Sequence, residues 1–293
     1  MAQEVNFKRR FGDRKEGRLV RSIDPITKFM PYVMRERSDG CNQFEDSLDI
    51  AAAEKWIKEK RAEGWKGMGM LHLFMAAYVR TISHCPGINR FVRGQRIMAR
   101  NDIVIAMNIK RELTLDKGET VVKFYPKPTY TAEEVYYMIE NTIQEAHDDD
   151  TDFDNTLAKI AKLPRFLLRG FMGTLSFLDY YGVFPKSLLK VSPFHASLYV
   201  TSMGSLGIPP VYHHLYDFGN VPLFLSFGRV VKKLHLNSDG SVTQKRVFPV
   251  RVTCDDRICD GHYYAIFFKT VRRYFKNPEL LDLPPETVNE DLP

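Results

Sequence analysis

Apolar residues alternate with polar ones along several segments of the chain, as expected for strands with one buried face. Such alternation occurs at residues 43–50, through most of 91–126, and in two long runs at 223–236 and 241–254. The turn sequence Asn-Ser-Asp-Gly at 237–240 joins the last two runs. These two runs therefore predict the clearest β-hairpin of the chain.

Other segments carry apolar residues at helical spacing. We expect helices at 18–36, where Asp24 and Pro25 provide a cap and a first turn, and from Thr131 to about residue 147. Further helices are predicted within the ranges 51–88, 154–163, about 165–180, and 261 onward. The helix at about 68–84 is apolar on most faces, so we expect it to be buried.

The most apolar window of the chain runs from Phe166 to Leu178. It contains Arg169 and is too short to cross a bilayer, so no membrane span is predicted. An interfacial helix and a buried helix both remain open for this window.

Length, charge and cysteine content narrow the class of protein. With 293 residues, 44% of them hydrophobic, and neither an internal repeat nor a low-complexity linker, the chain favours a single α/β domain. The net charge of +6 favours anionic ligands but is too small to predict nucleic-acid binding. The four cysteines lack metal-binding spacing and the N-terminal segment is polar, so we expect a reduced, cytoplasmic protein without a metal.

Five ionisable residues interrupt the apolar pattern between the second hairpin strand and the last helix. They are Asp255, Asp256, Arg257, Asp260 and His262. Asp260 followed by Gly261 can serve simply as a helix cap. A short polar turn would need fewer charges, so the junction is also a candidate site for chemistry.

The order of motifs around this junction resembles the catalytic domain of the dihydrolipoamide acyltransferase component of 2-oxo acid dehydrogenase complexes, which shares its fold with chloramphenicol acetyltransferase. The similarity rests on Asp-x-Arg-x-x-Asp-Gly before the last helix, on the later Asn-Pro-x-x-Leu, and on TSMGSLGI at 201–208, which is similar to the family's Ser-Asn-Leu-Gly loop. It also includes ITKFMPYVM at 26–34 and HCPGINRFVRGQRIMARNDIVIAMNIK at 84–110.

The resemblance implies a CAT-like α/β sandwich, in which helices cover a mixed sheet. It covers residues 18–283, with an N-terminal extension at 1–17 and a tail at 284–293. It further implies a homotrimer with an active channel between subunits, and coenzyme A or acyl-CoA as substrate. We expect neither nucleic acid nor a metal as a partner.

The resemblance also implies roles for single residues. The family has a general-base histidine at the position of Asp256, and a hydroxyl from the neighbouring subunit's loop, here Thr201 or Ser202, stabilises the oxyanion. The aspartate of Asp-Gly, here Asp260, anchors the loop through a basic residue of the first helix, for which Lys28 is the candidate. This chain departs from the pattern, because Asp255-Asp256-Arg257 stands where the family has Asp-His-Arg.

Three interpretations of that departure remain open. The protein is an acyltransferase with Asp256 as a desolvated base, or with His262 reaching the site. Alternatively, it is a catalytically inactive relative that serves as a trimeric structural or ligand-binding protein. In the third interpretation, the junction is only a capped helix and the fold carries no acyltransferase function.

Several other residue types have a structural explanation that is simpler than a functional one. We expect His213 and His214 to be a loop pair and His195 to be a partly buried strand residue, with His195 as a reserve candidate for the base, and we expect the cysteines beside the junction, Cys254 and Cys259, to be inert. We expect the basic residues of the hairpin, Arg229, Lys232 and Lys233, either to lie on a solvated strand face or to meet a CoA phosphate.

Overall fold

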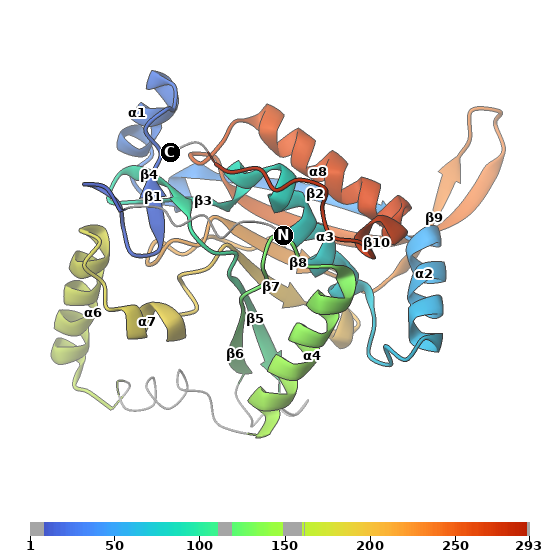
Figure 1. Cartoon of the computed structure of the whole chain (residues 1–293), viewed down its shortest axis with the longest axis horizontal. Helices are drawn as coiled ribbons and strands as arrows, with labels where there is room; N and C mark the ends of the chain where they lie inside the picture. The colour runs from blue at the N-terminus through green and yellow to red at the C-terminus, as the bar shows by residue number, and fades with distance from the viewer. Residues whose placement is uncertain (1–8, 111–118, 149–159, 161, 292–293) are drawn as a thin grey trace.

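A mixed seven-stranded sheet forms the centre of the protein in a computed structural model, which describes residues 9–110, 119–148, 160 and 162–291 (Figure 1). The strand order is β2-β10-β8-β7-β5-β6, and β9 pairs with the first half of β10. Strand β7 runs parallel to both β5 and β8, and the other pairs are antiparallel. The strands are β2 (Cys41–Asp49), β5 (Ile105–Lys110), β6 (Glu119–Phe124), β7 (Leu198–Ser202), β8 (Leu223–Phe227), β9 (Val231–Leu236) and β10 (Val242–Asp255).

Helices cover one face of this sheet and a long loop covers the other. The main core joins alternate residues of the strands, such as Val200 and Leu225, to helices α2 (Ala51–Ala62), α3 (Met70–His84), α4 (Ala132–Asp148) and α8 (Gly261–Lys276). On the opposite face, Tyr199 and Phe224 pack against Leu215 in a smaller cluster. This is the mixed sheet covered by helices that the resemblance implies, so the predicted fold class is confirmed.

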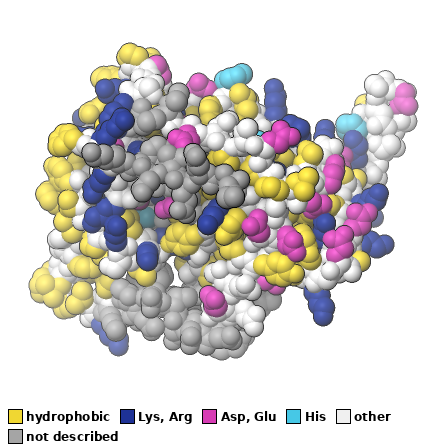
Figure 2. Space-filling model, in the orientation of Figure 1, with side chains coloured by type: hydrophobic (Ala, Val, Ile, Leu, Met, Phe, Trp, Pro, Cys, Tyr) yellow, Lys and Arg dark blue, Asp and Glu magenta, His cyan; other side chains and the backbone are white. Residues whose placement is uncertain are grey.

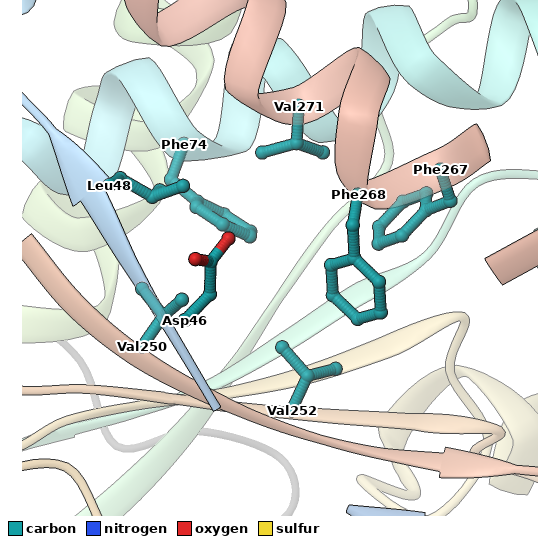
Figure 3. Close-up of a pocket in the computed structure, with 8 residues that line it drawn as sticks. All are labelled: Asp46, Leu48, Phe74, Val250, Val252, Phe267, Phe268 and Val271. Atoms are coloured by element: carbon teal, nitrogen blue, oxygen red, sulfur yellow. The ribbon is translucent and has the colours of Figure 1, made fainter. Parts of the chain in front are cut away.

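Helix α3 is the buried helix that its composition predicts. Twelve of its residues are buried, from His72 to Ser83. Helix α8 packs beside it, and Figure 3 shows Phe267, Phe268 and Val271 of α8 facing Val250 and Val252 of β10. The cavity left between them has a volume of about 10 Å³, at the lower limit of what one water needs. The helices and the sheet are therefore closely packed here.

A second, three-stranded sheet corrects one predicted element. Residues 18–24 are not helical, because β1 (Gly17–Leu19) pairs with β4 (Arg96–Arg100), which also pairs with β3 (Arg90–Arg93). Helix α1 (Pro25–Val33) begins only at the proline, where the Asp24 carboxylate accepts bonds from the amides of Ile26 and Thr27. Proline favours the first helical turn and restricts the residue before it to extended backbone, which sets this boundary.

The predicted hairpin also differs in one respect from the structure. Its first run is broken into β8 and β9 at Gly228–Val230, while β10 continues for 14 residues and pairs with both. A Cβ at Gly228 would lie 2.5 Å from Pro210, so this close approach requires glycine. The predicted helix at 154–163 falls mostly outside the described residues, and so does most of the sequence Asp-Lys-Gly-Glu at 116–119, which is typical of a turn.

Helix α6 (Arg165–Tyr180) and the short α7 (Lys186–Val191) lie outside the main layers, at the lower left of Figure 1. The ammonium group of Lys123 on β6 donates to the carbonyls of Leu189 and His195, at 2.8 and 2.9 Å, and so fixes the segment around α7. Burial, together with the charge of Arg100, lowers the pKa of Lys123 to about 7. Within the described part of the chain, no helix is long and apolar enough to cross a membrane.

Candidate active site

Asp255, the last residue of β10, is the structural anchor of the ionisable junction. Its carboxylate is fully buried and accepts two bonds from the Arg257 guanidinium, Nε to Oδ1 at 2.7 Å and Nη2 to Oδ2 at 2.8 Å. The Nε atom of Arg37 lies 3.5 Å from Oδ2. Burial disfavours the charge on Arg257, but its bonds and attraction to Asp255 outweigh burial and raise its pKa. Asp255 is therefore held between two cations.

The two arginines tie this junction to the end of the first helix. Arg257 Nη1 donates to the carbonyl of Met34 at 3.0 Å, and Arg37 donates to the carbonyls of Tyr216, Val92 and Gly219. Burial lowers the pKa of Arg37 to about 10, although the Asp255 charge opposes the shift. Together they fix α1, the β3–β4 hairpin and the 216–219 loop around the end of β10.

Asp256 differs sharply from its neighbour. It is half-buried, its backbone amide donates to Gly40 at 2.7 Å, and its Oδ1 accepts a bond from Asn42 Nδ2 at 2.5 Å. Within the described part of the chain it forms no ion pair. Burial raises the pKa of the Asp256 carboxyl, and the negative charge of Asp255 raises it further. A partly desolvated carboxylate without a cation is a stronger base than an exposed aspartate.

The remaining predicted residues of the junction lie on its exposed side. Asp260 caps α8 and accepts a bond from the Tyr263 amide at 2.8 Å, as its position before Gly261 predicts. His262, the second residue of the helix, is exposed. Lys28 is exposed on α1, and the ion pairs of the described residues do not join it to Asp260. In this structure Asp255 and Arg37 tie the junction to the end of α1, a contact that we had expected from Asp260 and Lys28.

Arg37 is the residue that sequence reasoning missed. The resemblance calls for a basic residue in the first helix, and Lys28 fits that place, whereas Arg37 follows the helix and is buried with 3% of its surface exposed. A fully buried cation must be paired. Nothing in the sequence pattern around Arg37 shows that it is buried.

Thr201 and Ser202, the candidates for the oxyanion hydroxyl, end strand β7. The register places Thr201 opposite Ser226 of β8, and Ser226 opposite Arg251 of β10. Asp256 lies five residues beyond Arg251, which corresponds to about 17 Å along the strand. Within one chain the two predicted halves of the site therefore lie at opposite ends of the sheet.

A cleft of about 280 Å³ lies beside the junction, between the end of α1, the β3–β4 hairpin and α6. Four arginines line it, Arg35, Arg37, Arg93 and Arg257. Three of them already use their guanidinium groups on backbone carbonyls and buried aspartates, including Arg93, which pairs with Asp179 at 2.7 Å. These three serve to hold the surrounding segments rather than to receive an anion.

His195 and His213 have structural surroundings, but His195 lies in the turn before β7 and not in the strand that we predict for it. His195 is buried, with its ring between the Ser192 hydroxyl at 2.8 Å and the Asp179 carboxylate at 3.3 Å, and burial lowers its pKa despite the Asp179 charge. His213 stacks on Phe224 at 3.7 Å between ring centroids. No group of three metal-ligating side chains occurs in the described ranges.

The cysteines and the basic hairpin residues have equally ordinary surroundings. Burial raises the pKa of the Cys254 thiol, and that of Cys259 to about 12, so neither forms a thiolate at neutral pH. Lys232 and Lys233 lie on the exposed strand β9, where Lys233 donates to the Ser47 hydroxyl at 2.8 Å, and Arg229 is exposed just before that strand.

Comparison with known proteins agrees with this architecture. Residues 196–283 match the sequence model of the family described as 2-oxoacid dehydrogenases acyltransferase (catalytic domain). A probable dihydrolipoamide acetyltransferase from Listeria monocytogenes superposes with a TM-score of 0.57 at 13% identity, covering 87% of this chain and 93% of its own. The chain has the fold of this acyltransferase catalytic domain.

Other solved structures extend the similarity of this acyltransferase fold. A dihydrolipoamide acetyltransferase from Azotobacter vinelandii superposes with a TM-score of 0.51 at 13% identity, covering 88% of this chain and 93% of its own. A chloramphenicol acetyltransferase does so with a TM-score of 0.52 at 14% identity, covering 86% and 96%. No curated protein sequence matches the chain significantly. The resemblance stated from the sequence motifs is confirmed at the level of fold.

Proposed function

We propose that the protein is a CoA-dependent acyltransferase with Asp256 as its general base, and that its active site forms between subunits of a homotrimer. The observation that carries the proposal is the contrast between the two adjacent aspartates. Asp255 is held between two cations, whereas Asp256 is half-buried, has no cationic partner among the described residues, and has a raised pKa. Asp256 is therefore the group at this junction that is available to accept a proton.

The position of Asp256 supports this role. The solved structure of the Azotobacter vinelandii acetyltransferase is described in terms of a serine, a histidine and an asparagine in the catalytic mechanism, the last two being four residues apart. Asp256 and Asp260 have the same spacing, and the matched segment 196–283 contains both the junction and the 201–208 loop.

Assembly from several subunits would resolve the separation of the two halves of the site. Thr201 and Asp256 lie about 17 Å apart along the sheet, too far for one reaction centre. Apolar side chains of this loop are exposed, with Leu206 at 53% and Ile208 at 42%. Contact with a second subunit would bury them and bring the loop of one subunit towards Asp256 of the next.

The reaction then follows from these two groups. Asp256 takes the proton of an acceptor thiol or hydroxyl, and the resulting nucleophile attacks the carbonyl carbon of the acyl-CoA thioester. The neighbouring Thr201 hydroxyl, or that of Ser202, donates to the oxyanion of the tetrahedral intermediate. Collapse of the intermediate breaks the bond to sulfur, and CoA leaves as its thiol with the proton returned from Asp256.

The test compares the formation of free CoA from acetyl-CoA, separated by chromatography, with a small dithiol as acceptor, by the wild type and three variants. We expect slow turnover by the wild type, loss of it in Asp256→Asn, and an increase of about 10²-fold or more in Asp256→His, since imidazole titrates near neutrality. His262→Ala is the matched control and should keep the wild-type rate. If His262→Ala abolishes turnover while Asp256→Asn retains it, the base is His262 and not Asp256.

Two further results would contradict the proposal. An inactive wild type and an inactive Asp256→His that still bind CoA would establish the alternative, a catalytically inactive trimer that binds ligand. Light scattering should give three times 33.9 kDa. A stable monomer at assay concentrations would exclude a site shared between subunits.

A further inference from the structure

In the described part of the chain, a single hydrogen bond holds the Asp256 carboxylate, and Asn42 donates it. Asn42 Nδ2 lies 2.5 Å from Asp256 Oδ1, although the two residues are 214 positions apart in the sequence. Asn42 is the second residue of β2 and, like Asp256, it is half-buried. Nothing in the sequence pattern indicates a role for this asparagine.

The register of two strands explains how these side chains meet. Strand β2 pairs with β10 so that Asn42 lies opposite Cys254. The Asp256 amide donates to the carbonyl of Gly40, which extends the pairing beyond the end of β10. Because side chains two residues apart share a face of the sheet, Asp256 lies on the face of Cys254, as a diagonal neighbour of Asn42. Asp255 lies on the opposite face, so the Asn42 bond reaches only the second aspartate.

This bond leaves one oxygen of the carboxylate for chemistry. Oδ1 accepts the bond from Asn42, whereas Oδ2 of Asp256 accepts none from the described residues. An ionised carboxylate has lone pairs on both oxygens, so a bond to one of them fixes its orientation and leaves the other able to take a proton.

The donor is also uncharged, unlike the partners of most surface carboxylates in this protein. Figure 2 shows Asp and Glu side chains interspersed with Lys and Arg at the right of the molecule, where α2 and the β9–β10 hairpin lie. Glu54 on α2, for example, pairs with Arg246 on β10 at 2.8 Å. A cation beside Asp256 would stabilise its ionised form strongly and make it a weak base. A neutral amide orients the carboxylate with a smaller effect of this kind.

A purely structural role for Asn42 is the alternative. Asparagine is among the residues depleted in strands, so the stability of β2 does not by itself favour it at this position. The two roles differ in a measurable way. A bond that positions the base depends on whether Asp256 is ionised, and a general packing role does not.

We propose that Asn42 is the positioning residue of the general base: it turns Asp256 so that Oδ2 meets the proton of the acyl acceptor, and it favours the ionised form that accepts this proton. The inference rests on the proposed function, because it assigns Asn42 to the acyl transfer reaction. The bond itself can be tested without turnover.

Urea unfolding between about pH 4 and pH 7 tests the bond in the wild type, Asn42→Leu, Asp256→Asn and the double variant. Leucine cannot donate, so the pKa of Asp256, already raised by burial, should rise further in Asn42→Leu. The stability cost of Asn42→Leu should therefore grow with pH as Asp256 ionises, and keep only a constant part where Asp256 is protonated. In the Asp256→Asn background the cost should be the same at every pH. A cost independent of pH in both backgrounds would show that Asn42 has only a structural role.

The formation of free CoA from acetyl-CoA tests the use of the bond in catalysis. In Asn42→Leu we expect kcat to fall about ten-fold or more, with little change in the KM for acetyl-CoA, because the base is misplaced. The rising limb of the pH profile should move to higher pH. Asn42→Ala, which adds no apolar bulk, should behave in the same way.

Gln43→Leu is the matched control, because Gln43 is the next residue of β2, is exposed, and lies on the other face of the sheet. It should keep the rate and the pH profile of the wild type. An active wild type whose rate and pH profile are unchanged in Asn42→Leu would overturn this inference alone. An inactive wild type would refute the proposed function, and with it the role of Asn42 in catalysis, even if the unfolding experiment detects the bond.

Discussion

Replacing Asp255 by asparagine should destabilise the protein far more than the same change at Asp256. Asparagine has the size of aspartate and can still accept one bond from Arg257. Its amide group, however, would place a donor against a donor of the guanidinium, and both Arg257 and Arg37 would lose their buried countercharge. The main effect of the change is therefore electrostatic.

The expected magnitude follows from the burial of the group. Asp255 has 0% of its surface exposed, and Arg37 and Arg257 have 3% each. Removing one member of such a buried pair costs about 3 to 5 kcal/mol, because the remaining charge is uncompensated. At roughly 2 °C for each kcal/mol in a chain of this size, the melting temperature should fall by about 6 to 10 °C.

Asp256→Asn is the control at the neighbouring position. Its folded-state pKa is raised, so the ionised carboxylate destabilises the fold once the pH exceeds that pKa. Asparagine removes this penalty and can keep the bond from Asn42 through its carbonyl oxygen. The free energy of unfolding at pH 7 should therefore stay the same or rise slightly.

Urea unfolding followed by circular dichroism at pH 7 measures both variants. A loss below about 1 kcal/mol in Asp255→Asn, or equal losses in both variants, would refute this assignment of roles. The double variant Asp255→Asn with Arg257→Gln should cost less than the sum of the single changes, because the two groups interact directly.

Three further predictions concern the core, the attachment of α6 and the pH dependence of stability. Phe267→Ala, in the closely packed region of Figure 3, should lower the free energy of unfolding by about 3 to 5 kcal/mol; a urea midpoint near that of the wild type would contradict the packing described. Gly94→Ala should expose α6 to proteolysis, because Gly94 has a φ of 59° and its added Cβ would collide with the Tyr180 carbonyl. Limited proteolysis measures the cleavage, with Gly170→Ala as a control whose Cβ meets open space, and equal cleavage of the two variants would contradict the prediction. Lys123 has a pKa of about 7 in the folded chain and about 10.4 in the unfolded chain, so the unfolded chain binds more protons between these values. The free energy of unfolding should therefore rise with pH over that range. Lys123→Met should lose this rise between pH 7 and pH 9 in urea unfolding, and an unchanged pH dependence would exclude the lysine as its source.

Local signals in the sequence predicted much of the fold. Asp260 and Gly261 predicted the start of α8, and the uniform apolar composition of α3 predicted its burial. Residues 18–24 were expected to be helical because their apolar spacing fits a helix as well as a short strand. Their partner strand β4 is about 80 residues away, and this tertiary pairing decides the outcome.

The candidate site was less predictable, for a related reason. Asp255, Asp256 and Asp260 are identical side chains within six residues, and only their three-dimensional surroundings distinguish them. Asp255 becomes the anchor because Arg37, more than 200 residues earlier in the chain, lies beside it. Periodicity reports which face of an element is buried, but it does not report which distant charge meets that face.

The long strand β10 has a consequence for how the protein forms during its synthesis. Nine residues of β2, from Cys41 to Asp49, pair with β10, which is made about 200 residues later. Until the ribosome has released the last part of the chain, β2 has no partner and its backbone amides and carbonyls are open to strands of other molecules. Contacts between such distant segments also form slowly. Nascent chains should therefore depend on chaperones for most of their synthesis, and truncation before residue 242 should leave a chain that aggregates rather than a smaller folded unit.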